Sequence, residues 1–260
     1  MESDSGDRCL FKNISIFCPE LILINMNFSN LNRRQLLGIS SYVGMGILLD
    51  SCGLNPYSTA VGNAIDPLNQ RVEELLLKPQ ALAREYPVSA IEPQALIINS
   101  FTAAPEIDPT TFKLIVDGAV NQPIQLSLND LSKLPLHSMT IQHVCVEGWA
   151  AIVQWGGVRL QDVIALAQPN ATARYVYFES GDGYYNSWDL PSAIHPQTLL
   201  AYLKNGQPLP VDNGAPLRLA APIKLGYKQS KWVTRVTLLD RLSNKQGYWE
   251  DQGYEWFGGL

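Results

Sequence analysis

The sequence predicts an α+β domain with a mixed sheet, and three observations lead to this fold class. Short apolar runs with strand-like alternation recur between Phe112 and Leu239, helical spacing occurs only between some of them, and turn signals join neighbouring strands directly. Strands connected by hairpins do not form the regular βαβ repeat of a parallel sheet. The composition, 46% hydrophobic and 17% charged over 260 residues, is that of a globular chain with a sizeable core.

One helix and one extended segment are predicted ahead of the sheet. The helix should open at Asp66-Pro67 and end at Pro79, with an apolar stripe at Val72, Leu75 and Leu76. From Tyr86 to Pro109 there is no helical period, and prolines interrupt short apolar pieces. We expect this stretch to wrap around the domain, carrying Asn99 with it.

The first strands should form a hairpin. A strand is predicted over 112–116, and Asp117-Gly118 is a turn signal that leads to a return strand over 124–126. The run from Ser127 to Asp130 has the pattern of a capping box, which opens a short helix before Pro135.

Within the next stretch, from Met139 to Trp149, we predict a buried strand that ends abruptly at Gly148. Trp155-Gly156-Gly157 should turn the chain into the next helix. The apolar positions of that helix are Leu160, Val163, Ile164 and Leu166.

The remaining elements rest on shorter signals. Tyr175 to Glu179 is predicted as a strand whose end lies beside that of the preceding buried strand, and Tyr184 and Tyr185 after it could border a pocket. A brief helix, a turn and two closing strands are predicted over Pro196–Leu203, Asn205-Gly206, Pro216–Ala220 and Val233–Leu239. The aromatic, glycine-rich stretch from Tyr248 to Gly258 should cap a surface or line an entrance.

The N-terminal region has the features of an export signal. Arg33-Arg34 precede an uncharged stretch over 38–49, which resembles a bacterial twin-arginine signal; a surface arginine pair before a short helix is the alternative. Because such signals have a short leading segment, we expect translation to start at Met26. The predicted organisation is a signal region over 1–53, a linker and helix over 54–85, and a single domain over 86–260.

The signal implies an exported protein, in the periplasm or an equivalent compartment, that folds and binds a cofactor before export. Leu49 to Gly53 also resembles a lipoprotein cleavage site in which Cys52 would be acylated, although Asp50 departs from the usual small residue. With Cys9 and Cys18 in the leader, the mature chain has no disulfide framework. The net charge of −5 argues against nucleic acid as a partner, since phosphate backbones need clustered cations.

Two stretches carry the chemistry, and the first is the strand that leads to Cys145. Strand alternation places His143 and Cys145 on one face, so an imidazole and a thiol stand together where a ligand crevice commonly opens. A thiolate is a soft metal ligand. The alternative is a buried cysteine that packs as a small hydrophobe.

The second stretch runs from Asn213 to Trp232. It offers one guanidinium group, three ammonium groups and a glycine loop, and these could hold a phosphate through charge-assisted hydrogen bonds. The cations are Arg218, Lys224, Lys228 and Lys231. A solvated basic loop is the alternative.

Together the two stretches resemble the molybdopterin-binding domain of the sulfite oxidase family, over about residues 99–239. The motif Cys145-Val-Glu-Gly-Trp149 is similar to the Cys-Val-Glu-Ala-Trp of the bacterial periplasmic methionine-sulfoxide reductase catalytic subunits within that family. The spacing Asn213-Gly-Ala-Pro-x-Arg218 agrees with the family as well.

The resemblance implies a sulfite-oxidase-type fold and a molybdenum–molybdopterin cofactor whose metal is ligated by Cys145, the catalytic position. By the same resemblance, the residues that hold the cofactor are Asn99, His143, Cys145, Ser180, Asn213, Arg218, Gln229, Ser230 and Lys231. Ser180 stands where the family has threonine, and Thr102 and Ala103 depart from its polar pair. A core histidine is the alternative for His143.

The activity implied is the transfer of an oxygen atom to or from sulfur. Reduction of S-oxides such as methionine sulfoxide is the first reading, because sulfite-oxidising members crowd arginine near the metal and residues 139–149 contain none. Sulfite oxidation is the second reading, and an exported metal-free binding module with the same fold is the third. The chain has three histidines and no Cys-x-x-Cys-His haem motif, so electrons should come from a separate carrier, a membrane haem protein or a cytochrome.

Overall fold

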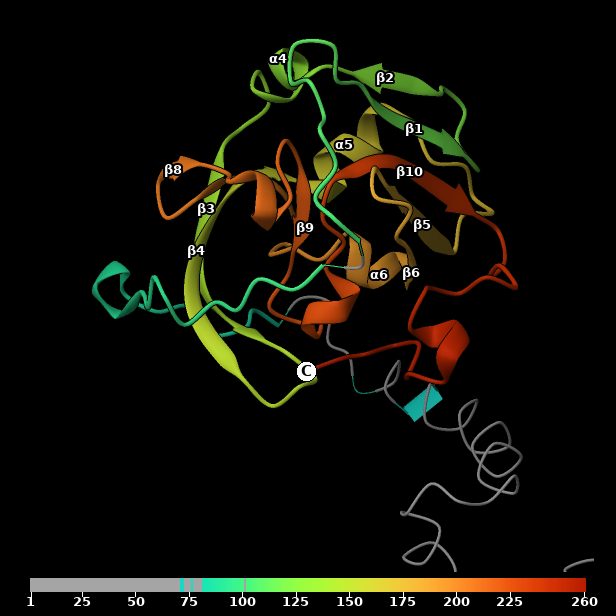
Figure 1. The fold of residues 1–260 in the computed structure, drawn as a ribbon. Helices are drawn as coiled ribbons and strands as arrows, with labels where there is room; N and C mark the ends of the chain where they lie inside the picture. The colour runs from blue at the N-terminus through green and yellow to red at the C-terminus, as the bar shows by residue number, and fades with distance from the viewer. Residues whose placement is uncertain (1–70, 73–75, 77–80, 101) are drawn as a thin grey trace, which may run out of the picture. The chain divides into compact units, whose positions relative to one another are not determined.

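The computed structural model describes residues 71–72, 76, 81–100 and 102–260, whose fold is shown in Figure 1. Every described residue belongs to one compact unit, which spans 61–260. The proposed signal, Cys52 and most of the predicted helix over 66–79 lie outside the described residues. The predicted division of the chain at 53 and 85 stays a prediction.

The first of two five-stranded sheets is mixed, with the strand order β2-β1-β10-β5-β6. Its strands are β1 (Leu114–Gly118), β2 (Ile124–Leu126), β5 (Tyr175–Ser180), β6 (Tyr185–Asp189) and β10 (Val233–Leu239). All neighbours are antiparallel except β1 and β10, which run parallel. The predicted mixed sheet is therefore confirmed, and it is completed only by the last strand of the chain.

The second sheet is antiparallel throughout and has the order β3-β4-β7-β8, with β9 paired to β7. Its strands are β3 (His137–Val144), β4 (Ala150–Arg159), β7 (Leu199–Lys204), β8 (Gln207–Pro208) and β9 (Arg218–Ala220). The pair β3 and β4 forms a long curved hairpin along one side of the fold in Figure 1. The tip of this hairpin carries the cysteine motif.

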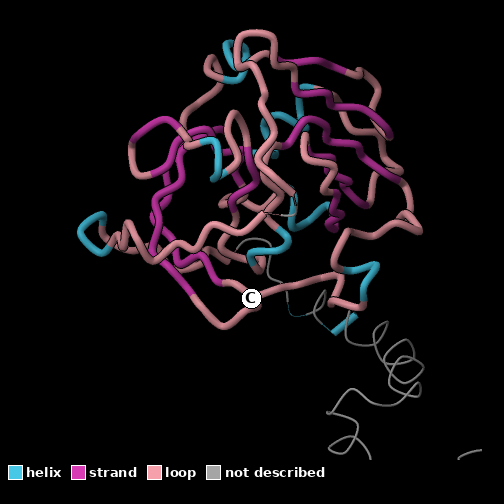
Figure 2. Tube along the Cα trace, in the orientation of Figure 1, coloured by secondary structure: helices cyan, strands magenta, loops and turns pink. Residues whose placement is uncertain are grey.

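The helices are short and lie between the strands, as Figure 2 shows. The α-helices are α4 (Leu128–Leu131), α5 (Leu160–Leu166) and α6 (Leu190–Ala193). The 3₁₀ turns are η2 (Val88–Ala90), η3 (Val211–Asn213), η4 (Gly226–Lys228) and η5 (Glu250–Gln252). The predicted capping box is confirmed at α4, where Ser127 Oγ accepts from Asp130 N–H and the Asp130 carboxylate accepts from Ser127 N–H. None of the helices in the described part of the chain has the length and apolarity needed to span a bilayer.

The core lies in two clusters, and the larger one also contains Val158, Leu200 and Leu219 from the second sheet. The larger joins the first sheet to α5 and includes Leu114, Val116, Val163, Ile164, Val176, Phe178, Trp188 and Val236. The smaller lies on the inner face of the second sheet and includes Met139, Ile141, Val153, Trp155 and Leu199. Met139, Ile141 and His143 are buried and Gln142 is exposed, as the predicted strand periodicity requires, while Thr140 on the opposite face is buried as well.

One turn prediction and one helix prediction in the second sheet were wrong, whereas the helix predicted from Leu160 is confirmed as α5. Trp155-Gly156-Gly157 does not turn the chain into a helix but lies inside β4, where a Cβ at Gly157 would stand 2.1 Å from Leu200 O. The glycine is there because β4 and β7 pair closely at a bulge. The helix predicted over Pro196–Leu203 is largely the strand β7, because a short apolar run fits a central strand as well as a buried helix.

Smaller predictions also changed. Asp117 and Gly118 do not form the hairpin turn but remain in β1, paired with β10, and the turn to β2 follows them. Leu166 is 43% exposed and does not belong to the buried face of α5. Val72 and Leu76, two positions of the predicted apolar stripe, are helical and are 45% and 72% exposed.

Gly118 gives a direct test of the β1–β10 pairing. Its φ is +87°, and a Cβ at this position would stand 2.1 Å from Leu238 O in β10. We expect Gly118→Ala to lower the free energy of unfolding by about 2–4 kcal/mol in urea denaturation, because backbone strain and a backbone clash add together. Gly206→Ala is the matched control, since Gly206 has φ +75° and open space around it, and it should cost about 1 kcal/mol. Equal losses in the two variants would contradict the steric explanation.

Candidate functional site

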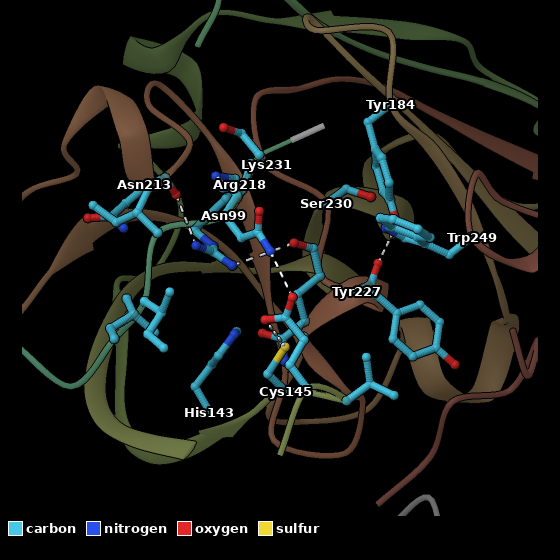
Figure 3. Close-up of a pocket in the computed structure, with 18 of the residues that line it drawn as sticks. Asn99, His143, Cys145, Tyr184, Asn213, Arg218, Tyr227, Ser230, Lys231 and Trp249 are labelled. Atoms are coloured by element: carbon cyan, nitrogen blue, oxygen red, sulfur yellow. Dashed lines mark hydrogen bonds between the residues drawn. The ribbon is translucent and has the colours of Figure 1, made fainter. Parts of the chain in front are cut away.

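A cavity of about 180 Å³ opens beside the end of β3. It is lined from five separate parts of the chain, which fall within 96–100, 143–149, 182–184, 213–232 and 249–254. Figure 3 shows Cys145 and His143 on one side, Asn213, Arg218 and Lys231 on a second side, and Tyr184, Tyr227 and Trp249 on a third. Residues distant in sequence therefore meet around one space.

The structure brings eight of the nine predicted site residues to this cavity. They are Asn99, His143, Cys145, Asn213, Arg218, Gln229, Ser230 and Lys231. The ninth, Ser180, ends β5 and is buried, but it is not part of the lining. Asp182 and Tyr184, from the turn that follows Ser180, line the cavity instead.

Cys145 stands one residue beyond β3, at the start of the tight turn into β4. Its N–H donates to Trp149 O at 2.9 Å, and Gly148 N–H donates to Cys145 O at 3.1 Å. Gly148 has φ +89°, which allows the reversal. The strand thus ends at Val144, before the predicted Gly148, and the turn leaves the thiol half-buried at the cavity rather than packed in the core.

The thiol of Cys145 has a carboxylate beside it. Sγ donates to Glu147 Oε2 at 3.6 Å, and the same carboxylate accepts from Asn99 Nδ2 at 3.0 Å and Trp149 Nε1 at 2.9 Å. Burial raises the pKa of the Cys145 thiol, and the nearby negative charge of Glu147 acts in the same direction. Glu147 therefore joins the cysteine turn to the wrapping segment that carries Asn99.

His143 is a buried, neutral imidazole on the cavity wall. Burial, and then the charge of Arg218, lower its pKa to about 3. Its ring stacks on Trp149 at 5.9 Å and meets Trp155 edge-on at 6.2 Å. Nδ1 forms no hydrogen bond with any described residue, although it is fully buried. Because His143 lines the cavity, this nitrogen is available to a bound ligand.

Arg218 is a buried cation with no carboxylate partner among the described residues. Its guanidinium donates to Asn213 O and Leu219 O at 3.0 Å and to Gln229 O at 3.5 Å, and it lies 4.4 Å from the Trp155 ring. Burial lowers the pKa of Arg218 to about 9, so it remains protonated at pH 7. A buried positive charge paired only with carbonyl dipoles favours an incoming anion.

Arg218, Ser230 and Lys231 together line one side of the cavity, which we call the cationic wall. Lys231 Nζ donates to Asn99 O at 2.6 Å and Asp212 O at 3.0 Å, and burial, then the charge of Arg218, lower its pKa to about 8. Ser230 Oγ is buried and has no hydrogen-bond partner among the described residues. Two cations and an unpaired hydroxyl on one wall suit a phosphate group.

The phosphate cradle predicted from four cations is smaller than the sequence indicated. Lys224 and Lys228 are both buried, so this is not a solvated basic loop, but neither side chain lines the cavity. Lys224 Nζ lies 3.4 Å from Asp189, and Lys228 forms an ion pair with Glu250. Only Arg218 remains with Lys231 on the cavity wall, because the other two cations are neutralised inside the fold.

Two further predicted residues have side chains occupied by structural bonds. The Gln229 amide accepts from Ala221 N–H at 3.2 Å and donates to the carbonyl oxygens of Ala221 and Lys224 at 3.0 and 2.8 Å. Asn213 Oδ1 accepts from Lys204 Nζ at 2.9 Å. The Gln229 side chain therefore fixes the backbone at Ala221 and Lys224, and the Asn213 side chain fixes Lys204.

Sequence reasoning missed most of the apolar and aromatic lining. Tyr227 and the run Leu96–Ile98 carry no pattern that points to a site. Trp249 and Tyr254 line the cavity, and they belong to the aromatic stretch that was predicted to cap a surface or line an entrance. Tyr184 lines the cavity as well, and Tyr185 does not. No group of three His, Cys, Asp or Glu side chains in the described part of the chain could hold a metal ion by itself. A metal at the thiol would need ligands brought by the bound group.

Comparisons with known proteins identify relatives over most of the chain. The family described as the oxidoreductase molybdopterin binding domain matches residues 101–249. A protein of Azospira oryzae with the provisional name protein-methionine-sulfoxide reductase subunit YedZ1 is 37% identical over 232 residues, covering 87% of each chain. The protein-methionine-sulfoxide reductase catalytic subunit MsrP of Campylobacter jejuni is 28% identical, covering 75% of this chain and 70% of its own.

One further relative and one structural neighbour have names that describe other activities. The mitochondrial sulfite oxidase of Rattus norvegicus is 32% identical over 69% of this chain, which spans only 37% of the oxidase. The crystal structure of the sulfane dehydrogenase SoxCD from Paracoccus pantotrophus superposes with a TM-score of 0.51 at 22% identity, covering 55% of this chain and 42% of that chain. This second likeness concerns the fold alone.

Proposed function

The chain belongs to the oxidoreductase molybdopterin binding domain family and is a molybdopterin-dependent oxidoreductase, and from that premise we propose that it reduces a neutral organic S-oxide. The names of the relatives from Azospira oryzae and Campylobacter jejuni support this substrate. One observation of the cavity carries the proposal further: the side that faces away from the cationic wall is aromatic and apolar (Figure 3).

The cavity fits the cofactor of the family. The unpaired Nδ1 of His143 and Oγ of Ser230 are buried polar atoms that a pterin and its phosphate would satisfy. Arg218 and Lys231 would hold the phosphate, and Cys145 would ligate the metal through its thiolate. When bound, this group supplies a metal that exchanges an oxygen atom with sulfur and electrons with a carrier.

The residues of the chain orient and enclose this chemistry. Glu147, fixed by Asn99 and Trp149, holds the side chain of Cys145 toward the cavity. The buried His143 stays neutral and stacked, so it offers a hydrogen bond without a charge. The aromatic side of the cavity would limit the access of water to the sulfur atom of the bound substrate.

The charge of the substrate distinguishes S-oxide reduction from sulfite oxidation. Sulfite is an anion and needs cationic groups where it binds. Among the described residues that line the cavity, Arg218 is the one arginine, and it lies in the cationic wall, bonded to backbone carbonyls. The side chains of Tyr184, Tyr227 and Trp249 offer a neutral surface, which favours an uncharged S-oxide.

We propose two further properties that rest on the sequence. Electrons would come from a separate carrier, a membrane haem protein or a soluble cytochrome that docks near the cavity. The protein would be exported through the Arg33-Arg34 signal, and Arg33→Lys combined with Arg34→Lys should leave it in the cytoplasmic fraction. If the double variant still reached the periplasm, the export proposal would be wrong.

The test of function uses holoenzyme purified from cells that synthesise the cofactor. We expect about one molybdenum per chain, oxidation of reduced viologen by methionine sulfoxide, and little reduction of ferricyanide by sulfite. A protein without molybdenum would support the binding module instead. Faster turnover with sulfite than with any S-oxide would reverse the assignment.

A further inference from the structure

Part of the aromatic side of the cavity lies outside the residues that match the family. The matched region ends at residue 249, yet Tyr254 lines the cavity, and Trp249 stands at the boundary. Both belong to the C-terminal segment over 247–260, which follows the last strand of the first sheet and returns to the cavity. The segment adds a surface that the family match does not cover.

The rings of this segment form a continuous aromatic surface with η4. Trp249 lies 5.2 Å from Tyr254, and Tyr254 meets Tyr227 edge-on at 5.5 Å between ring centroids. Tyr248 connects Trp249 to Tyr184 at 5.1 and 6.1 Å. Figure 3 shows Tyr184, Tyr227 and Trp249 together across the cavity from Asn213. These separations are those of favourable aromatic pairs.

The C-terminal segment is held firmly enough to keep this surface in place. Glu250, next to Trp249, forms a fully buried ion pair with Lys228. Gly247 packs so tightly that a Cβ there would stand 2.0 Å from the Glu250 carboxylate. Tyr227 OH donates to Glu255 O at 2.6 Å. The aromatic surface is therefore preorganised before a substrate arrives.

A second set of bonds fixes the end of the segment. Trp256 Nε1 donates to Ser187 Oγ at 2.8 Å, and the 258–260 backbone pairs with residues 223–225. A Cβ at Gly258 would stand 2.7 Å from Tyr227 OH, so the segment crosses close to η4. Both ends of the stretch that carries Trp249 and Tyr254 are thus anchored to the first sheet and η4.

We propose that Trp249 and Tyr254 are specificity-determining residues that contact the carbon substituents on the sulfur of a neutral organic sulfoxide. This inference rests on the proposed function and adds the residues that select the substrate. A sulfoxide presents an S–O dipole on one side and apolar carbon groups on the other, and its thioether product makes favourable sulfur–aromatic contacts. The aromatic surface suits those carbon groups, and the oxygen would face the side of the cavity where Cys145 would ligate the metal.

The test compares Trp249→Leu and Tyr254→Leu with wild-type holoenzyme, using reduced viologen and two substrates, methyl phenyl sulfoxide and dimethyl sulfoxide. Loss of one aromatic contact should raise KM for methyl phenyl sulfoxide by about 3- to 10-fold. The effect on dimethyl sulfoxide should be smaller, and kcat should change less than about twofold because the rings do not touch the reacting oxygen. Trp249→Phe and Tyr254→Phe should restore most of the wild-type KM.

Two measurements separate substrate selection from a structural role. The molybdenum content of both leucine variants should equal that of the wild type. Tyr177→Leu is the matched control, because Tyr177 stacks on Tyr185 at 6.2 Å and does not line the cavity, and it should leave every KM unchanged.

The possible failures are distinguishable. A wild-type holoenzyme inactive with all sulfoxides would overturn the proposed function and this inference with it. Wild-type activity with unchanged KM in both leucine variants would overturn the inference alone. Loss of molybdenum from those variants would overturn it as well, since the rings would then support the cofactor rather than the substrate.

Discussion

Cys145→Ser should lower the turnover of S-oxides by at least about a thousandfold, measured with reduced viologen and purified holoenzyme. A serine hydroxyl does not ionise at neutral pH and is a hard ligand, so it cannot replace a soft thiolate at the metal. The cationic wall is untouched in this variant. Pterin bound per chain should therefore fall much less than activity does.

The fold of this variant should remain intact. Cys145 is half-buried at a turn, and its side chain bonds only to Glu147 among the described residues, a bond that serine can also make. We expect a change of less than about 0.5 kcal/mol in the free energy of unfolding of the cofactor-free protein. A serine variant with more than a tenth of wild-type activity would show that the reaction does not need the thiolate.

Arg218→Gln should lower the cofactor retained after purification by at least about tenfold, measured as molybdenum and pterin per chain. The variant removes the buried charge that has no carboxylate partner and that would meet the cofactor phosphate. Lys204→Gln is the matched control, because Lys204 contacts Asn213 but does not line the cavity. Equal cofactor loss in both variants would contradict a specific role for Arg218.

Inorganic phosphate gives a second readout of the same wall that does not depend on activity. Millimolar phosphate should raise the melting temperature of cofactor-free wild-type protein and should not raise that of Arg218→Gln. The cationic forms bind the anion, and the pKa values are about 8 for Lys231 and about 9 for Arg218. The stabilisation should therefore be present at pH 7 and decline as the pH rises through 8 and 9.

The parts of the fold that could be predicted have a local cause. The alternation of Met139, Ile141 and His143 is fixed by strand geometry, and the capping box at Ser127 needs only three neighbouring residues. The strand β7 could not be separated from a helix, because its apolar run is short and its identity depends on pairing with β4. Gly157 looked like a turn signal because a close strand contact also requires glycine.

In the site as well, residues with a local sequence signal could be predicted, and residues whose role depends on distant partners could not. Cys145 and Arg218 were found from motifs that chemistry confines to a few residue types. Lys228 could not be distinguished from Lys231, because its partner Glu250 comes from a distant segment that only the folded chain brings near. The apolar lining over 96–98 carries no chemical signature, so only the structure could place it.

The contacts of Lys231 and Tyr254 determine which fragments of the chain can contain a complete cavity. Lys231 Nζ bonds to Asn99 O across 132 positions of sequence, and Tyr254 closes the cavity from beyond the last matched residue. An expression fragment cut at 101 and 249 would keep the cysteine and the arginine yet lack material on two sides of the pocket. Such a minimal fragment should fail to retain cofactor, whereas one spanning 81–260 should keep it.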